Sequence, residues 1–284
     1  MALTPNDNIH ALQIQAGALG RKAGHAFEDK ITEELNGLCC PIRVQELSSH
    51  VLVGDPALLL LHYIAEKEGL GEIQTISALS TGALATSEEG KRFLNIEGKS
   101  VSRCKSDLII TIEDPNARIT VGVSTKQCNN KTPTNAQLYF TTALGFSRLL
   151  INNGIPVSDT AINALRQFCG DTGFRPLDEP DKLKNRLFDN RRFFWEEIDK
   201  EGREEWEAIF SQCQDDVSRL LFQKAYLDDP FSPEYLLHKT KASDSWDDTE
   251  VAIYSINEII TLSKNYRGFY TKPYSVKKGS FKDP

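Results

Sequence analysis

The chain has 284 residues, of which 40% are hydrophobic and 26% charged, the balance of an ordinary globular protein. It lacks a run of about 20 apolar residues, which excludes a membrane-spanning helix, and its first residues lack the basic-then-apolar order of a secretion signal. We therefore expect a cytoplasmic protein that forms one large domain or two smaller ones.

The net charge of −7 argues at first against a nucleic-acid partner, but the charge is unevenly distributed. Residues 178–216 carry 13 acidic and 7 basic side chains, whereas residues 263–284 carry 6 basic and 1 acidic. Binding depends on where charges lie rather than on their sum. The basic segment, with tyrosines and a phenylalanine interleaved, is therefore a candidate DNA contact, or else a terminal segment packed on the body.

The six cysteines do not form a zinc-binding pattern. No two of them have the gap of about two to four residues that lets thiolates close on one zinc ion, and adjacent Cys39 and Cys40 cannot easily chelate one metal together. The histidines likewise show no metal-binding spacing. We expect buried free thiols, as in a reducing compartment.

The first expected element is a helix from about Ile9 to Leu38. Its residues Phe27, Ile31, Leu35 and Leu38 repeat at spacings of four, four and three, which places them on one apolar stripe. Residues 41–98 mix short apolar runs with polar turns. They predict one or two helices and a connecting stretch.

Residues 106–126 predict a β-hairpin. Ser106–Ile112 and Arg118–Lys126 are both rich in β-branched residues, which favour strands. Between them lies Glu113–Asn116, a turn sequence in which Pro115 presets φ and the Asp and Asn side chains can cap the turn. The two strands should therefore pair closely.

The rest of the chain looks mainly helical. A helix is expected from Asn135 to about Ile151, and further helices from Asp159 onward. The apolar segments Tyr235–Leu237 and Val251–Ile256 could add strands. We therefore predict an α/β (α+β) fold, with residues 1–155 forming a sheet flanked by helices and residues 156–284 a mainly helical region that can be continuous with it.

The hairpin carries the residues best suited to chemistry. Alternate strand residues share a face, so Ser124 and Lys126 point one way and Thr125 the other. If the strands pair closely, Lys126 faces Asp107. A carboxylate can supply oxygen to Mg²⁺, and an ammonium beside it can orient a water nucleophile. The alternative is that Asp107 merely caps a strand and Lys126 extends from the sheet edge.

Three segments resemble the PD-(D/E)xK nuclease superfamily, which includes most structurally known type II restriction endonucleases. They are the helical Gly24–Glu28, the pair Ser106-Asp107 and the tripeptide Ser124-Thr125-Lys126. The resemblance implies a restriction-endonuclease-like core with Asp107, Ser124, Lys126 and Glu28 in the catalytic site and Mg²⁺ bound by Asp107 and Glu28. Two positions depart from the pattern: Ser106 stands where proline is common, and Ser124 stands where the second acid is usual.

The departure at Ser124 removes one carboxylate from the expected metal site. Some restriction enzymes of the superfamily carry S-x-K and take a carboxylate from a helix, and Glu28 is the candidate that the resemblance offers here. The helix expected after the tripeptide contains no acid between Lys126 and Ile151. The polar residues that follow the tripeptide lie where DNA would be expected: Asn129, Asn130, Lys131, Thr132, Thr134 and Gln137. They suit phosphate and base contacts, or form an ordinary polar loop.

We therefore expect a type II restriction endonuclease that hydrolyses double-stranded DNA at a short specific site with Mg²⁺. A homodimer is expected because one active site cuts one strand and a two-fold protein matches a palindromic target. The mainly helical second half would then serve DNA recognition or dimerisation. Two alternatives remain: an antiphage DNase with little sequence preference, and a non-catalytic DNA-binding or partner-binding protein on the same fold.

Overall fold

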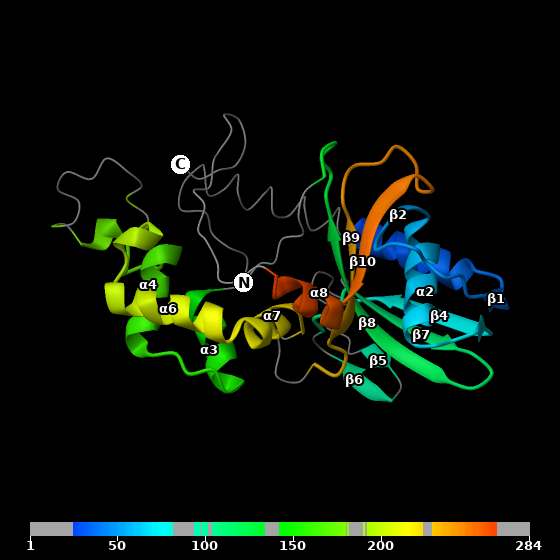
Figure 1. The fold of residues 1–284 in the computed structure, drawn as a ribbon, viewed down its shortest axis with the longest axis horizontal. Helices are drawn as coiled ribbons and strands as arrows, with labels where there is room; N and C mark the ends of the chain where they lie inside the picture. The colour runs from blue at the N-terminus through cyan, green and yellow to red at the C-terminus, as the bar shows by residue number, and fades with distance from the viewer. Residues whose placement is uncertain are drawn as a thin grey trace. The chain divides into compact units, whose positions relative to one another are not determined.

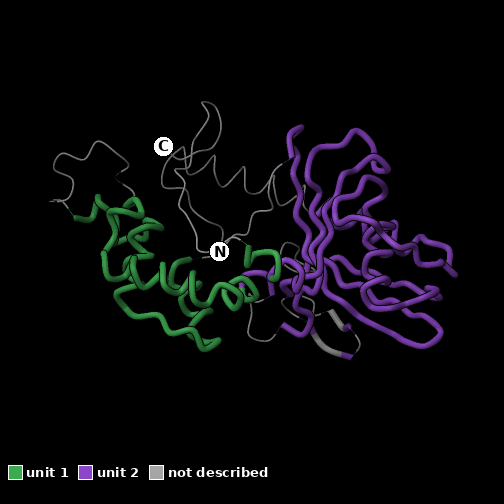
Figure 2. The backbone as a smooth tube through the Cα atoms, viewed as in Figure 1, with its two compact units in different colours: residues 1–16, 138–220, 261–284 green, residues 17–137, 221–260 purple. Residues whose placement is uncertain are grey.

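The computed structural model describes residues 25–81, 94–96, 98–101, 104–133, 142–179, 181, 190, 192–223 and 229–265. No helix within these ranges is both long and apolar enough to cross a membrane. The chain divides into two compact units (Figure 2). The described residues within 17–137 and 221–260 form the purple unit, here called the sheet unit. Those within 138–220 and 261–284 form the green unit, here called the helical unit.

The sheet unit is built on a six-stranded sheet (Figure 1). Neighbouring strands are antiparallel, except for one parallel pair, β8 and β9. This arrangement confirms the predicted α/β (α+β) class with a mixed sheet. The strand order is β2 (Val51–Gly54), β10 (Thr249–Ser255), β9 (Pro233–Lys239), β8 (Arg118–Gln127), β7 (Leu108–Glu113) and β4 (Thr75–Ser80).

The division into units differs from the boundary predicted near residue 155. Residues 221–260 return to the sheet unit because β9 and β10 complete its sheet. The late apolar segments named in the sequence are these two strands.

Strands β7 and β8 form the predicted hairpin. They pair from Leu108 opposite Val123 to Glu113 opposite Arg118. At the turn, the Asp114 side chain accepts hydrogen bonds from two backbone amides at 2.7 and 2.6 Å. The carboxylate thereby accepts hydrogen bonds from turn amides that have no partner on the opposite strand. This stabilises the turn and so the register of the β7–β8 hairpin.

One face of the sheet is covered by the helix at residues 25–37 and by α2 (Pro56–Lys67). The predicted stripe residues Phe27, Ile31 and Leu35 are buried there, which confirms that part of the first helix. Burial of each such side chain is worth about 1.5–3 kcal/mol. Helix α2 begins after Asp55, whose carboxylate accepts from two backbone amides of the first turn at 2.8 and 3.3 Å.

The opposite face of the sheet packs on α8 (Ile256–Ser263). Leu236 of β9 is buried against Ile256 and Ile260, whereas the next residue, Leu237, belongs to the core under the first two helices. Strand alternation thus gives each face its own apolar layer. Two short pairs complete the unit, β1 (Ile42–Arg43) with β3 (Glu72–Ile73), and β5 (Leu94–Ile96) with β6 (Lys99–Val101).

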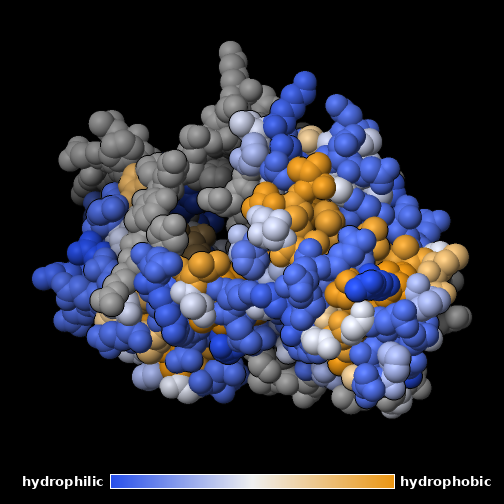
Figure 3. All heavy atoms as spheres, turned by 45° about the vertical axis from the view of Figure 1, so that its right-hand side comes forward, coloured by the Kyte–Doolittle hydropathy of each residue, from blue (hydrophilic) through white to orange (hydrophobic). Residues whose placement is uncertain are grey.

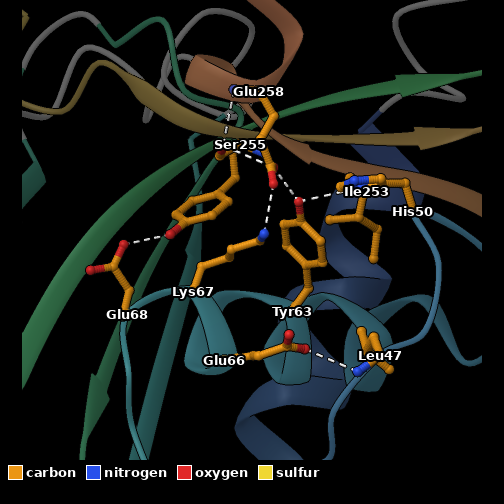
Figure 4. A network of polar contacts seen from close by, with 10 residues as sticks. Leu47, His50, Tyr63, Glu66, Lys67, Glu68, Ile253, Ser255 and Glu258 are labelled. Carbon is orange, nitrogen blue, oxygen red and sulfur yellow. Dashed lines mark hydrogen bonds and ion pairs between the residues drawn. The ribbon is translucent and has the colours of Figure 1, made fainter. Parts of the chain in front are cut away.

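A polar network joins α2 to the start of α8 (Figure 4). The Glu258 carboxylate accepts hydrogen bonds from the Tyr63 hydroxyl, from the Lys67 ammonium at 2.6 Å, and from the backbone amide and hydroxyl of Ser255, each at 2.9 Å. Burial raises the pKa of Glu258, but the hydrogen bonds outweigh burial and bring it down to about 2. The charged carboxylate therefore ties two helices from distant parts of the sequence together.

The helical unit contains α3 (Ala143–Asn152), α4 (Asp159–Cys169), η3 (Pro176–Asp178), η4 (Trp195–Glu197), α6 (Lys200–Gln212) and most of α7 (Gln214–Gln223). Its core centres on Trp206, which is fully buried and donates from its indole nitrogen to the carbonyl of Ala161 at 2.7 Å. Gly202 lets α4 and α6 approach closely, because a Cβ there would lie 2.6 Å from the Cβ of Ala164. The helices expected from Asp159 onward are present.

Some expectations differ from the structure. Residues 41–98 contain one described helix, α2, within the one or two that were predicted, but the prediction of a connecting stretch was wrong where the structure has strands. Of the cysteines, only Cys128 is buried, so buried thiols were wrong for most of them. The early part of the first expected helix and the start of the one expected at Asn135 lie outside the described residues. Nearly all of the basic segment at 263–284 does too.

Hydrophobic side chains also reach the surface. Figure 3 shows several apolar patches among hydrophilic residues on the face it draws. Val51 and Val53 of the edge strand β2 are 48% and 62% exposed. Residues two apart on a strand share a side, so these two valines form one apolar strip along the edge.

Candidate active site

The backbone of Asp107 is fixed at the start of β7. Its amide donates to the carbonyl of Val123 at 2.8 Å, and its carbonyl accepts from the amide of Thr81 at 2.9 Å. The hairpin register then places Asp107 across from Ser124. The carboxylate therefore stands at one end of the two central strands.

The Asp107 carboxylate meets all three residues of the tripeptide. Its Oδ2 atom accepts from the backbone amide of Thr125 at 2.7 Å and from the hydroxyl of Ser124 at 3.1 Å, and it lies 3.5 Å from Nζ of Lys126. The Lys126 ammonium also donates to Ser124 Oγ at 2.8 Å and to the carbonyl of Thr125 at 2.6 Å. The predicted pairing of an acid with a lysine on one side of the hairpin is present, and both side chains remain partly exposed.

Glu28 reaches the same end of the sheet from the helix at residues 25–37. It is buried, and its Oε1 accepts from the Thr125 hydroxyl at 2.9 Å. Its other oxygen, Oε2, is also buried and has no hydrogen-bond partner within the described part of the chain. Buried carboxylate oxygens are normally hydrogen-bonded or bound to a cation, so an unpartnered one points to a ligand.

The charge state of Glu28 follows from this position. The pKa of Glu28 is raised to about 7, mainly by burial and next by the negative charge of Asp107. The hydrogen bond from Thr125 and the charge of Lys126 oppose the rise but do not cancel it. Glu28 and Asp107 are thus two carboxylates that repel each other, and a cation between them would relieve the repulsion.

The donor set suits a hard divalent cation. Mg²⁺ is typically bound by one or two carboxylates together with water and substrate phosphate oxygens, rather than by a full protein cage. Two carboxylates match that pattern. The site therefore fits Mg²⁺ better than zinc, which favours nitrogen and sulfur ligands.

Ser106, the residue before Asp107, has a structural role. Its hydroxyl donates to the carbonyl of Phe231 at 2.6 Å. It also fills the space beside Gly122, where an added Cβ would lie 2.2 Å from the Ser106 oxygen. Ser106 therefore locks the residue next to Asp107 to the segment before β9.

Two charged or titratable residues near the site were missed in the sequence. His238 of β9 is in register with Lys126 across the parallel pair, and burial, then the charge of Lys126, lowers its pKa. Lys105 precedes Asp107 by two residues, and burial, then the charge of Lys126, lowers its pKa. The K-S-D order could have suggested Lys105, whereas His238 required knowledge of the β8–β9 pairing.

The predicted DNA-contacting residues are only partly described. Asn129, Asn130, Lys131 and Thr132 are exposed in the loop after β8. The carbonyl of Asn130 accepts from the amide of Ala242 at 2.7 Å, which joins this loop to the loop after β9. Thr134 and Gln137 lie outside the described residues.

Comparison with known proteins gives no relative from which a role could be transferred. No model of a known protein family matches the chain, and no curated protein sequence matches it. Functional assignment therefore rests on the geometry and charge of the site.

Proposed function

We propose that the protein is a Mg²⁺-dependent deoxyribonuclease of the type II restriction endonuclease kind, acting on a short site in double-stranded DNA. The observation that carries the proposal is the Asp107–Lys126 pair at one end of β7 and β8, with Glu28 bonded to Thr125 at the same end. One buried oxygen of Glu28 has no partner among the described residues. The likeness of the three segments to the PD-(D/E)xK superfamily supports the same assignment.

Each residue has a role in this proposal. Asp107 and Glu28 would hold Mg²⁺, which when bound polarises a phosphodiester and lowers the pKa of bound water. Lys126, held by Ser124 Oγ and the Thr125 carbonyl, would orient the attacking water and stabilise negative charge on the phosphate. Ser124 keeps Asp107 and Lys126 in position, which is a use for a hydroxyl where an acid is usual.

The substrate and assembly belong to the same proposal. Duplex DNA would be contacted by the exposed loop residues 129–132, and a homodimer would cut both strands of a two-fold site. A cytoplasmic location is proposed as well, because the six cysteines are free.

The test is cleavage of a defined plasmid by Asp107→Asn and Lys126→Ala, with Lys200→Ala as the control. Lys200 is an exposed lysine of α6 in the helical unit. Each site variant should lose at least about 100-fold of the Mg²⁺-dependent rate, since such groups contribute about 10²–10⁴. Circular dichroism checks that the variants fold. Wild-type cleavage by Lys126→Ala would refute the assignment, and a smear instead of discrete fragments would refute its site specificity.

A further inference from the structure

The two edges of the six-stranded sheet differ. Strand β4 forms one edge, where Asn36 donates from its side-chain nitrogen to the carbonyl of Ala78 at 2.9 Å and accepts from the Ala78 amide at 2.8 Å. Asn36 thus occupies the place of a further strand, and covering an edge in this way keeps it from pairing with another chain. Strand β2 forms the other edge, beside β10 (Figure 1), and no strand of the described chain pairs with its outer side.

The backbone of β2 directs two of its residues away from the sheet. The carbonyl of His50 accepts from a backbone amide of β10 at 2.9 Å. Alternate residues of an antiparallel strand bond to the same neighbour, so Leu52 also faces β10, whereas Val51 and Val53 direct their amides and carbonyls outward. The Val51 amide agrees with this direction, because it donates to Oγ of Ser49 at 3.1 Å rather than to β10. The outer side of β2 therefore presents the groups with which a strand pairs.

The side chains of β2 lack the features that usually keep an edge from pairing. Residues 51–54 read Val-Leu-Val-Gly, without a charge or a proline. Val51 and Val53 are both exposed and stand on the same side of the sheet. A partner strand would remove them from water, which is favourable for an apolar side chain.

We propose that β2 pairs antiparallel with β2 of a second copy of this chain, about a two-fold axis at Leu52. In this register the outward groups of Val51 in one copy meet those of Val53 in the other, and the symmetry repeats the pair across the axis. Cross-strand partners share a face, so the four valines of the two copies pack together on one side of the joint sheet.

A second copy suits this edge better than another partner, because the strand is complementary to itself. The charged or titratable residues beside β2 are His50 and Asp55, and the register sets them opposite Gly54 and Ser49, so like charges do not meet. Duplex DNA is not favoured, since residues 51–54 offer no cation to a phosphate. The use of the dimer rests on the proposed function, for which it supplies the surface that joins two active sites on one duplex.

The test is the oligomeric state of the full chain without DNA, measured by sedimentation velocity over an about hundredfold range of concentration. The wild type should be a dimer that dissociates on dilution. Val51→Lys combined with Val53→Lys sets lysine against lysine in both valine pairs and should weaken the dimer at least about tenfold. Val51→Glu combined with Val53→Lys sets unlike charges together in the same register and should dimerise at least about tenfold more tightly than the double-lysine variant. Ile151→Lys combined with Leu177→Lys replaces exposed apolar residues of the helical unit and should leave the dimer unchanged.

Recovery with unlike charges separates strand pairing from a simple loss of apolar surface, which would weaken both charged variants equally. Val53→Pro adds a second route, because it removes an outward amide that β10 does not use, and should also weaken the dimer. Circular dichroism checks that each variant folds. A monomeric wild type, equal dimerisation of the two charged variants, an unchanged dimer in folded Val53→Pro or a loss of the dimer in the helical-unit control overturns the proposal.

Plasmid cleavage is measured on the same samples. A monomeric wild type that cleaves plasmid with Mg²⁺ overturns the β2 interface alone. A dimer that behaves as expected but does not cleave overturns the proposed function and leaves the interface standing.

Discussion

Replacing Glu28 with glutamine should make the protein more stable at alkaline pH while removing its proposed activity. The carboxylate is buried and its pKa is about 7, against an ordinary value of 4.5. Because the folded-state pKa is raised, the stabilising contribution of the neutral form is fully present below about pH 4.5 and is lost as pH rises through 7. Glutamine matches the neutral carboxyl in shape and never ionises.

The size of the effect follows from the two pKa values. Relative to acid pH, the raised pKa of Glu28 lowers the unfolding free energy by about 3 kcal/mol at pH 8 but by only about 1 kcal/mol at pH 5. Contributions that do not depend on pH cancel when the two conditions are compared. The gain in unfolding free energy from Glu28→Gln should therefore be larger at pH 8 than at pH 5 by about 2 kcal/mol.

Urea unfolding of both proteins at pH 5 and pH 8, with EDTA present, measures this difference. Glu33→Gln is the control, because Glu33 is an exposed residue of the same helix. This substitution removes a carboxylate from the solvent-exposed surface, whereas Glu28→Gln removes a buried one. A Glu28→Gln gain of the same size at both pH values would refute the reasoning. So would a Glu33→Gln gain with the same pH dependence.

Two further predictions concern the framework of the sheet unit. Glu258→Gln should lower the unfolding free energy by about 2 kcal/mol at pH 7, because the lowered pKa of Glu258 means that its charged form stabilises the fold. Urea unfolding should show this loss shrinking as pH falls from 4.5 toward 2, where the carboxylate becomes protonated. A loss that stays constant down to pH 2 would contradict the prediction. Gly122→Ala should cost at least about 2 kcal/mol, since the new methyl meets Ser106 at 2.2 Å, whereas Gly71→Ala, which faces open space, should be near neutral in the same melts. Equal effects of the two glycine changes would show that the Ser106 contact is unimportant.

The hairpin and the pairing of Asp107 with Lys126 could be predicted because the information is local. Residues 106–126 are rich in β-branched residues, carry a strong turn and place Asp107 and Lys126 on strands that are adjacent in sequence. No long-range pairing had to be guessed. Glu28 lies far away in sequence, and only the family resemblance indicated it. The sequence indicated that Thr125 faces the side opposite to Ser124 and Lys126, but its hydrogen bond to Glu28 was not foreseen.

The missed features depend on contacts between distant segments. Strand β2 was not recognised because its residues Val51 and Val53 face outward and give no alternation of buried apolar and exposed polar side chains. His238 approaches Lys126 only through the parallel pairing of β8 with β9, which periodicity cannot reveal.

The sheet order also has a consequence for biosynthesis. Strand β2 pairs with β10, and β8 pairs with β9, so the middle of the sheet comes from late in translation. A nascent chain that ends before Pro233 contains β7 and β8 but not β9, the strand that pairs with the other edge of β8. Long-range pairing of this kind is slow to form. The sheet can therefore be completed only after the chain has been synthesised as far as Ser255, the last residue of β10.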